Sequence, residues 1–176
     1  MKILVTGAKG FIGKNLIAEL KNRKYDNIFE YDRDTDSSLL DEYCKEADFV
    51  FHLAGVNRPK EQSEFMEGNF GFTSDLLDSL KKHNNTCPVM ISSSIQAELD
   101  NPYGESKKAG EDLIFNYSKE TGAKVLVYRF PNVFGKWCRP NYNSAVATFC
   151  NNVAHNLPIQ VNDPSVVMRL LYIDDV

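Results

Sequence analysis

The sequence predicts an α/β fold, in which a doubly wound parallel sheet carries helices on both faces. Two observations lead to this prediction. Short apolar segments alternate with segments of helical periodicity, and three glycines separate the first apolar segment from the first helix. Such alternation is typical of crossover connections between parallel strands. The chain has 176 residues, which is about the size of one domain.

Five short apolar segments are expected to form the strands. They cover residues 2–6, 27–31, 48–54, 87–92 and 124–130. The last of them contains Val125-Leu126-Val127-Tyr128, and such a continuous apolar run fits a strand that is buried on both faces. Apolar spacing predicts helices over residues 11–20, from Ser37 onward, over 73–82 and over 103–119.

The character of the sequence changes after Phe130. Prolines, glycine and asparagines make a loop-rich segment up to about Asn143. A helix is expected over residues 145–156, and a short apolar run follows at 170–173.

Composition argues against several classes of partner. Twenty basic and 24 acidic residues give a net charge of −4, so a nucleic acid or an anionic membrane is not expected. No apolar run approaches the roughly 18 residues of a membrane span. The four cysteines lack metal-ligand spacing, so no metal site is expected. Free thiols are typical of a reducing cytoplasm, where we expect the protein.

Gly7, Gly10 and Gly13 lie between the first expected strand and the first expected helix. The first permits a tight turn, the second lets a phosphate approach the backbone, and the third allows close packing of helix on strand. The N–H groups at the start of the helix then face the anion. This placement predicts a dinucleotide site.

Asp32 and Arg33 follow the second expected strand, where cofactor choice is made. A ribose 2′-hydroxyl favours an acid at this place, whereas a 2′-phosphate favours an arginine. We favour Arg33 as a phosphate ligand with Asp32 turned aside, and therefore NADPH. NAD(H) stays open, as does a solvated loop position for Arg33.

Tyr103 and Lys107 are four residues apart, so they share one face of the expected helix. A phenol has a pKa near 10, and a nearby ammonium or an oxidised nicotinamide favours its ionised form. Tyr103 is thereby suited to proton exchange with a hydroxyl or carbonyl. Ser94, which is expected just past the fourth strand, can hydrogen-bond the same oxygen. The alternative is a surface tyrosine beside a solvated lysine.

Together these segments resemble the extended short-chain dehydrogenase/reductase superfamily, which has a Rossmann-like fold. The similar motifs are Thr6-Gly7-x-x-Gly10-x-x-Gly13, His52-Leu53-Ala54-Gly55, Ser92-Ser93-Ser94, Asn101-Pro102-Tyr103-Gly104-x-Ser106-Lys107, Arg129-x-x-Asn132-x-x-Gly135 and Tyr172-x-Asp174-Asp175-Val176. The resemblance implies catalytic roles for Ser94, Tyr103 and Lys107. It also implies that Asn69 helps to hold the lysine and a proton relay, although a structural role for Asn69 is an open alternative. The cofactor contacts expected on these grounds are Gly7, Gly10, Phe11, Ile12, Gly13, Asp32, Arg33, Leu53, Ala54, Gly55, Tyr103 and Lys107.

Three further stretches, at residues 55–59, 92–97 and 135–144, are similar to the CapF-type enzymes of bacterial capsular polysaccharide synthesis. That family joins a reductase half to a C-terminal cupin half. The resemblance implies that residues 1–176 form an NAD(P)-binding domain that is incomplete at its C-terminal end. Within it, roughly residues 131–176 are expected to begin the substrate-binding part.

The resemblance implies NADPH-dependent reduction of a 4-keto-6-deoxy UDP-N-acetyl-hexosamine by an enzyme that is a homo-oligomer when intact. An NAD-dependent sugar-nucleotide epimerase and a non-catalytic dinucleotide sensor are the alternatives. The resemblance also argues against dehydration, because dehydratases of the superfamily carry an acid pair directly after the catalytic hydroxyl residue. Here those positions are Ile95 and Gln96, and neither side chain can shuttle a proton. The candidates for binding the UDP-sugar, each of which is otherwise a solvated loop residue, are Arg58, Asn132, Lys136, Arg139 and Asn141.

Overall fold

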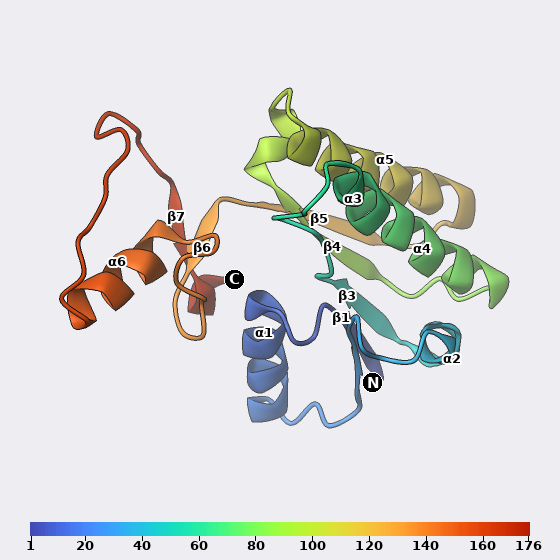
Figure 1. Cartoon of the computed structure of the whole chain (residues 1–176). Helices are drawn as coiled ribbons and strands as arrows, with labels where there is room; N and C mark the ends of the chain where they lie inside the picture. The colour runs from blue at the N-terminus through green and yellow to red at the C-terminus, as the bar shows by residue number, and fades with distance from the viewer. The chain divides into compact units, whose positions relative to one another are not determined.

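A computed structural model describes residues 1–176, which form two compact units, Met1–Arg129 and Phe130–Val176. The first unit is built on a five-stranded sheet in the order β2-β1-β3-β4-β5 (Figure 1). Strand β1 runs parallel to β2 and to β3, and β3 runs parallel to β4. The strands are β1 Ile3–Thr6, β2 Ile28–Tyr31, β3 Phe49–His52, β4 Val89–Ser94 and β5 Val125–Phe130. The α/β class and the parallel sheet are confirmed.

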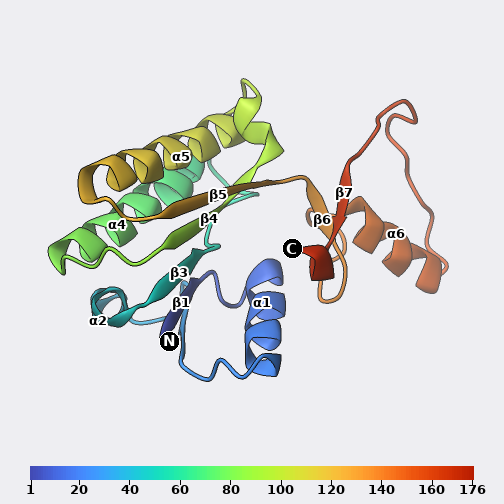
Figure 2. The ribbon, with the colours of Figure 1, turned by 180° about the vertical axis from the view of Figure 1, so that it is seen from behind.

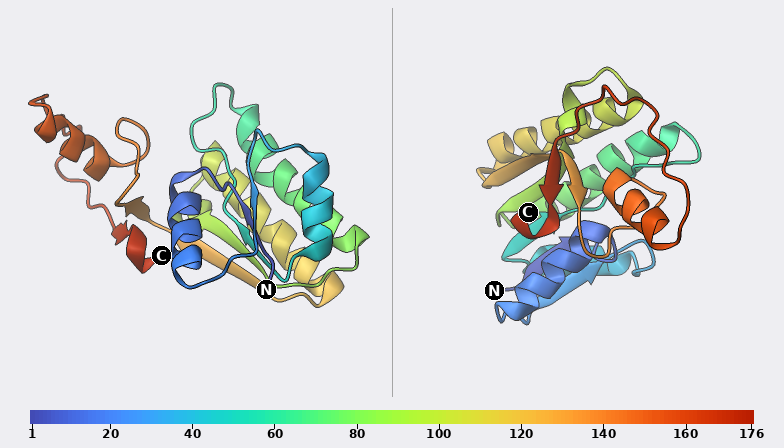
Figure 3. Two further views of the ribbon diagram at one scale, coloured as in Figure 1. Left: turned by 90° about the horizontal axis from the view of Figure 1, so that it is seen from below. Right: turned by 90° about the vertical axis from the view of Figure 1, so that its left-hand side faces the viewer.

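Helices cover both faces of this sheet (Figures 2 and 3). Helix α1 lies on one face, and α2, α4 and α5 lie on the other. The helical elements of the first unit are α1 Phe11–Asn22, α2 Ser38–Glu46, α3 Ser63–Met66, the π-helix η1 Glu67–Gly71, α4 Phe72–Lys82, the 3₁₀-helix η2 Ile95–Glu98 and α5 Pro102–Thr121.

Strand β1 divides the core into two layers because alternate side chains of a strand point to opposite faces. Ile3 and Val5 pack with Ile17 and Leu20 of α1. Leu4 faces the second layer. That layer contains buried side chains from α2, α4 and α5, among them Leu40, Leu76, Leu80, Ile114 and Tyr117.

Strand β4 extends further than expected. The predicted end at Ser92 is wrong, and Ser94 is the last residue of the strand rather than a residue beyond it. Serines fit a wholly buried strand here because each has a partner. The Ser92 Oγ donates to the His52 carbonyl, the Ser93 Oγ donates to Glu111, and the Ser94 Oγ accepts from the Gln96 N–H.

The helix predicted over 73–82 begins earlier, because α3, η1 and α4 form one run from Ser63 to Lys82. Gly68 and Gly71 obscure the helical period in the sequence. Packing favours a glycine at position 68, because a Cβ there would lie 2.3 Å from the Cγ2 of Val56. A π-turn inside a helix often marks a functional position.

The second unit contains a small parallel sheet that the sequence did not predict. Strand β6, Asn132–Phe134, pairs with β7, Leu170–Tyr172. The Phe134 and Tyr172 rings pack 5.5 Å apart between these strands. The expected helix is confirmed as α6, Ala145–Ala154, and the 3₁₀-helix η3 covers Ile173–Asp175. No helix in the chain combines the length and apolarity that crossing a bilayer requires.

Gly104, in the first turn of α5, packs directly against η2. A Cβ at this position would lie 2.2 Å from the Gln96 carbonyl oxygen and 2.5 Å from that of Leu99. We therefore expect Gly104→Ala to lower the free energy of unfolding by about 1–3 kcal/mol in urea denaturation. Gly71→Ala is the matched control, because its Cβ would meet nothing closer than 3.9 Å. It should be neutral, or stabilising by up to about 1 kcal/mol. Equal losses in both variants would contradict this account.

Candidate active site

The glycine loop is folded tightly against the segment that follows β3. Gly7 has φ +69°, and a Cβ there would lie 2.7 Å from the Ala54 nitrogen. A Cβ on Gly13 would lie 2.2 Å from the Gly7 carbonyl oxygen. Gly10 is the N-cap residue of α1 and provides no side-chain cap, so the first N–H groups of the helix are available to an anion. This backbone fits the diphosphate of a dinucleotide.

Asp32 ties the end of β2 to the glycine loop. One carboxylate oxygen accepts from the backbone N–H of Lys9 at 2.8 Å, and the other accepts from the N–H of Arg33 at 2.8 Å. The Lys9 ammonium pairs with Asp34. Lys9 and the exposed Arg33 are therefore both cations at this end of the sheet. Lys9 is not among the cofactor contacts expected from the sequence, although its position between Gly7 and Gly10 places it in the glycine loop.

Tyr103 lies at the start of α5, where the Asn101 side chain caps the helix by accepting from the Gly104 N–H at 2.8 Å. Burial raises the pKa of the Tyr103 phenol, and a hydrogen bond with the Ser94 side chain acts in the opposite direction. The structure therefore brings the predicted Ser94 and Tyr103 together. Phe65 of α3 packs 5.6 Å from the Tyr103 ring, a contact that the sequence interpretation did not include.

Lys107 is buried one turn after Tyr103. Its ammonium donates to the Ser92 carbonyl at 2.7 Å. Burial lowers the pKa of Lys107 to about 8, while the Glu111 carboxylate acts to raise it. The ammonium therefore remains mostly protonated at neutral pH.

Asn69 lies in the π-helix η1, and its side chain connects this helix with the segment after β3 and with α5. Its side chain accepts from the Val56 N–H at 2.9 Å and donates to the Val56 carbonyl and to the Ser106 hydroxyl. A Cβ on Gly55 would lie 2.8 Å from the Asn69 Oδ1 and 3.7 Å from the Lys107 Nζ, so these three residues meet. The contacts match the structural alternative for Asn69, and its role toward Lys107 stays a prediction.

His52 is buried in a chain of hydrogen bonds that fixes its tautomer. The Thr73 hydroxyl donates to the Asn69 carbonyl at 2.6 Å, so the Thr73 oxygen accepts from the His52 Nε2–H. His52 Nδ1 is then an acceptor, and the Thr6 hydroxyl donates to it at 2.8 Å. Burial lowers the pKa of His52 to about 3, with the Lys107 charge acting in the same direction.

The expected substrate residues lie in both units. Arg58 is exposed in the first unit, on the loop after β3, and the other four belong to the second unit. Lys136 pairs with Asp174 at 2.7 Å, and Arg139 lies over the Tyr142 ring. The Asn132 side chain donates to the Arg169 carbonyl, and the Asn141 N–H donates to the Thr148 hydroxyl. Their binding of a sugar nucleotide stays a prediction.

The neutral His52 makes stability depend on pH. Its ordinary pKa of 6.5 applies to the unfolded chain, whereas the folded value is about 3. The unfolded state therefore binds the proton first, and the free energy of unfolding falls as the pH drops below 6.5. The slope from one proton is at most about 1.4 kcal/mol per pH unit. In denaturation at a series of pH values, His52→Gln should lose this slope.

His155→Gln is the matched control for that measurement, because His155 is exposed at the end of α6. It should leave the slope in place. The ¹⁵N shifts of the His52 ring should report the Nε2–H tautomer. A slope retained in His52→Gln, or an Nδ1–H tautomer, would contradict the assigned chain of hydrogen bonds.

Comparisons with known proteins identify relatives of this chain. The family model described as the NAD dependent epimerase/dehydratase family matches residues 3–176. A Pseudomonas aeruginosa protein named UDP-2-acetamido-2,6-beta-L-arabino-hexul-4-ose reductase is 48% identical over 176 residues, which are 100% of this chain and 47% of the relative.

Two solved structures show the same fold. Capsular polysaccharide assembling protein CapF from Staphylococcus aureus matches with a TM-score of 0.89 at 51% identity, covering 99% of this chain and 47% of that one. UDP-glucose 4-epimerase from Thermotoga maritima, with UDP-glucose, matches with a TM-score of 0.88 at 22% identity, covering 99% of this chain and 70% of that one. The second likeness is one of fold alone. The chain spans about half the length of the curated relatives it matches.

Proposed function

The chain belongs to the NAD dependent epimerase/dehydratase family, and from this premise we propose that it forms the cofactor-binding and catalytic part of a sugar-nucleotide reductase. The proposed reaction is NADPH-dependent reduction of a 4-keto-6-deoxy UDP-N-acetyl-hexosamine. The observation that carries the proposal is the constellation of Ser94, Tyr103 and the buried Lys107. The likeness to the Pseudomonas reductase and to CapF supports the substrate class.

Tyr103 is the proposed general acid. It gives its proton to the sugar carbonyl oxygen, and the positive charge of Lys107 stabilises the phenolate that remains. The Ser94 oxygen accepts from the Gln96 N–H, and its hydroxyl would turn from Tyr103 to donate to the same carbonyl oxygen when substrate binds. A nicotinamide dinucleotide, when bound, supplies the hydride. In this proposal Tyr103 transfers the proton, and Lys107 stabilises the negative charge that remains on the phenol oxygen.

The proposed cofactor site is the glycine loop with its two flanking segments. The backbone of Gly7, Gly10, Phe11, Ile12 and Gly13 would hold the diphosphate. Arg33 and Lys9 would bind a 2′-phosphate, because Asp32 is already engaged by two backbone N–H groups. The segment Leu53–Gly55 would complete the site.

An NAD-dependent sugar-nucleotide epimerase is the second candidate. Asp32 favours it, because an acid at the end of β2 suits a ribose 2′-hydroxyl. A dinucleotide sensor has no use for Tyr103 and Lys107 in contact with Ser94 and Ser92, so the geometry favours an enzyme. The identity of the cofactor separates the first two candidates.

The extent of the functional parts is also a proposal. Residues 1–176 would be the NAD(P)-binding domain of a cytoplasmic enzyme that is a homo-oligomer when intact. Roughly residues 131–176 would begin the part that binds the UDP-sugar. The start of the second compact unit at Phe130 supports that division.

Tyr103→Phe tests the general acid. In the intact enzyme this variant should lower turnover by at least about 100-fold, because the positioned proton is lost, while NADPH still binds. Turnover of a 4-keto-6-deoxy sugar nucleotide and the NADPH dissociation constant are the measurements. Tyr25→Phe is the matched control, because Tyr25 is exposed outside the site. Near-wild-type turnover of Tyr103→Phe would end the assignment.

Arg33→Ala tests the cofactor. Loss of a charge-assisted contact with the 2′-phosphate should weaken NADPH binding by roughly 1.5–3 kcal/mol and leave NADH binding nearly unchanged. Titration of the chain with each cofactor gives both values. Arg23→Ala, which removes an exposed arginine paired with Glu19 at the end of α1, should change neither. Equal losses for NADPH and NADH in Arg33→Ala would favour the epimerase candidate.

A further inference from the structure

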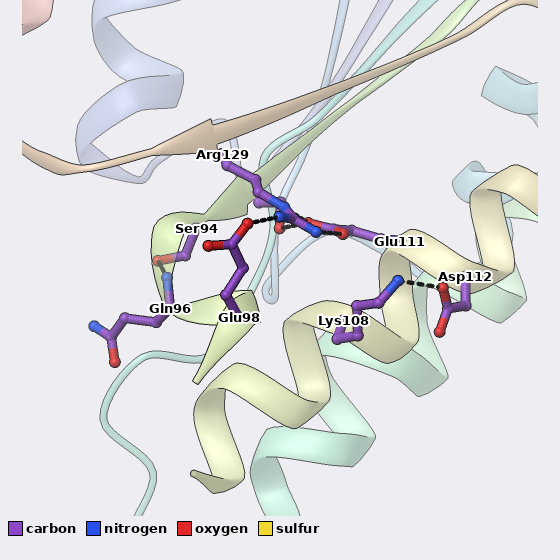
Figure 4. Close-up of polar contacts among 8 residues, drawn as sticks. Ser94, Gln96, Glu98, Lys108, Glu111, Asp112 and Arg129 are labelled. Atoms are coloured by element: carbon purple, nitrogen blue, oxygen red, sulfur yellow. Dashed lines mark hydrogen bonds and ion pairs between the residues drawn. The ribbon is translucent and has the colours of Figure 1, made fainter. Parts of the chain in front are cut away.

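Glu111 is a carboxylate buried inside the first unit, on α5. Its side chain is 1% exposed. Arg129, on β5, donates to both carboxylate oxygens, through Nε at 2.8 Å and Nη2 at 2.6 Å. The Ser93 hydroxyl donates to the same group at 2.5 Å, and the third Arg129 nitrogen pairs with Glu98 of η2 at 2.6 Å (Figure 4). Glu111 is thus ionised and fully hydrogen-bonded.

Burying the Glu111 carboxylate is costly, and an apolar residue of similar shape at such a place often gives equal or greater stability. The Arg129 side chain is 33% exposed, so Glu111 is the partner whose removal from water has to be offset. The carboxylate thereby puts a negative charge inside the contact between α5 and β4. Lys107 lies one helical turn earlier on the same face of α5, and it is itself buried.

The two side chains contact neighbouring residues of the same strand. Lys107 donates to the carbonyl of Ser92, and Glu111 accepts from the hydroxyl of Ser93. Arg129 holds Glu111 through two nitrogens, which leaves the carboxylate little freedom to turn. A fixed anion and a fixed cation are thereby built into adjacent positions of the α5–β4 contact.

We propose that Glu111 is a positioning residue that keeps the buried Lys107 protonated, and that Arg129 fixes the carboxylate for this purpose. The proposal rests on the proposed function, because that function requires Lys107 to be a cation beside Tyr103. It goes beyond that function by assigning a role to two residues outside the proposed catalytic group. Glu111 of α5 stabilises the charge of Lys107, and Arg129 of β5 holds Glu111 in place.

The charged and titratable groups around Lys107 come from several elements. His52 faces it from β3 as a neutral ring, and Tyr103 and Glu111 lie on its own helix. Around Glu111, Arg129 comes from β5 and Lys108 from α5, and both favour the ionised carboxylate. Burial lowers the pKa of Lys107 and Glu111 opposes that effect, so removal of the carboxylate should release the proton at lower pH.

The test is the titration of Lys107 in the folded chain, followed by NMR of the lysine side chain and assigned with Lys107→Met. In Glu111→Gln the pKa should fall from about 8 by about half a pH unit or more. Asp112→Asn is the matched control. Asp112 is the next residue on α5, but it is exposed and pairs with Lys108 at 2.6 Å (Figure 4). Its removal should leave the Lys107 titration unchanged.

A second variant protects the test against misfolding. Glu111→Gln/Arg129→Met leaves no unpaired buried charge, so it should fold even if the single variant does not. Its Lys107 pKa should also lie below that of the wild type. It should lie above that of Glu111→Gln, because it lacks the Arg129 guanidinium, which in the single variant keeps only the exposed Glu98 as its partner. An unchanged Lys107 titration in either folded variant overturns the proposal.

The intact enzyme separates this proposal from the proposed function. The alkaline limb of the turnover–pH profile should move to lower pH in Glu111→Gln and stay in place in Asp112→Asn. A shifted Lys107 titration together with full turnover by Tyr103→Phe would overturn the proposed function and leave the role of Glu111 standing. A fixed Lys107 titration would overturn the role of Glu111 and leave the proposed function standing.

Discussion

The contact between α5 and β4 is the constraint on which the candidate site depends. Three α5 side chains at intervals of four residues each contact one of three consecutive serines: Tyr103 with Ser94, Lys107 with Ser92, and Glu111 with Ser93. Burying these polar groups would be costly if any of them lacked a partner. Because every hydrogen bond depends on the same registration of helix on strand, a shift of α5 would break them together. The registration of α5 therefore determines both the position of Tyr103 and the charge beside it.

The second buried network connects the glycine loop with the π-helix. Thr6, the residue before Gly7, donates to His52, and the chain continues through Thr73 to the carbonyl of Asn69. Burial keeps the His52 ring neutral, and its two hydrogen bonds fix the orientation of the ring. They tie β1 and β3 to the helical run that carries Asn69. The glycine loop and Asn69, which meets Lys107 beside Gly55, are consequently held by one framework.

Short-range patterns in the sequence predict part of the fold and of the candidate site, and contacts between distant residues determine the rest. The strands, the glycine loop and the places of Tyr103 and Lys107 one turn apart on one helix follow from short-range patterns, and the structure has them there. The π-helix, the β6–β7 pairing and the anchoring of Asp32 by Lys9 depend on partners distant in the chain. The ion pair between the buried Glu111 and Arg129 belongs to the same class, because its two residues are 18 positions apart and no short-range pattern links them.

Tyr103 follows Ser94 by only nine positions, and this short connection has structural consequences. The chain must leave β4, turn through η2 and enter α5 within that distance, so η2 packs directly on the first turn of α5. Gly104 makes this approach possible, and the Asn101 side chain caps the start of the helix. Arg129 adds a further restraint, because it joins Glu98 of η2 to Glu111 of α5. A connection so short and so restrained leaves Ser94 little freedom relative to Tyr103. The hydroxyl that would orient a substrate oxygen and the phenol that would protonate it are therefore arranged before any substrate binds.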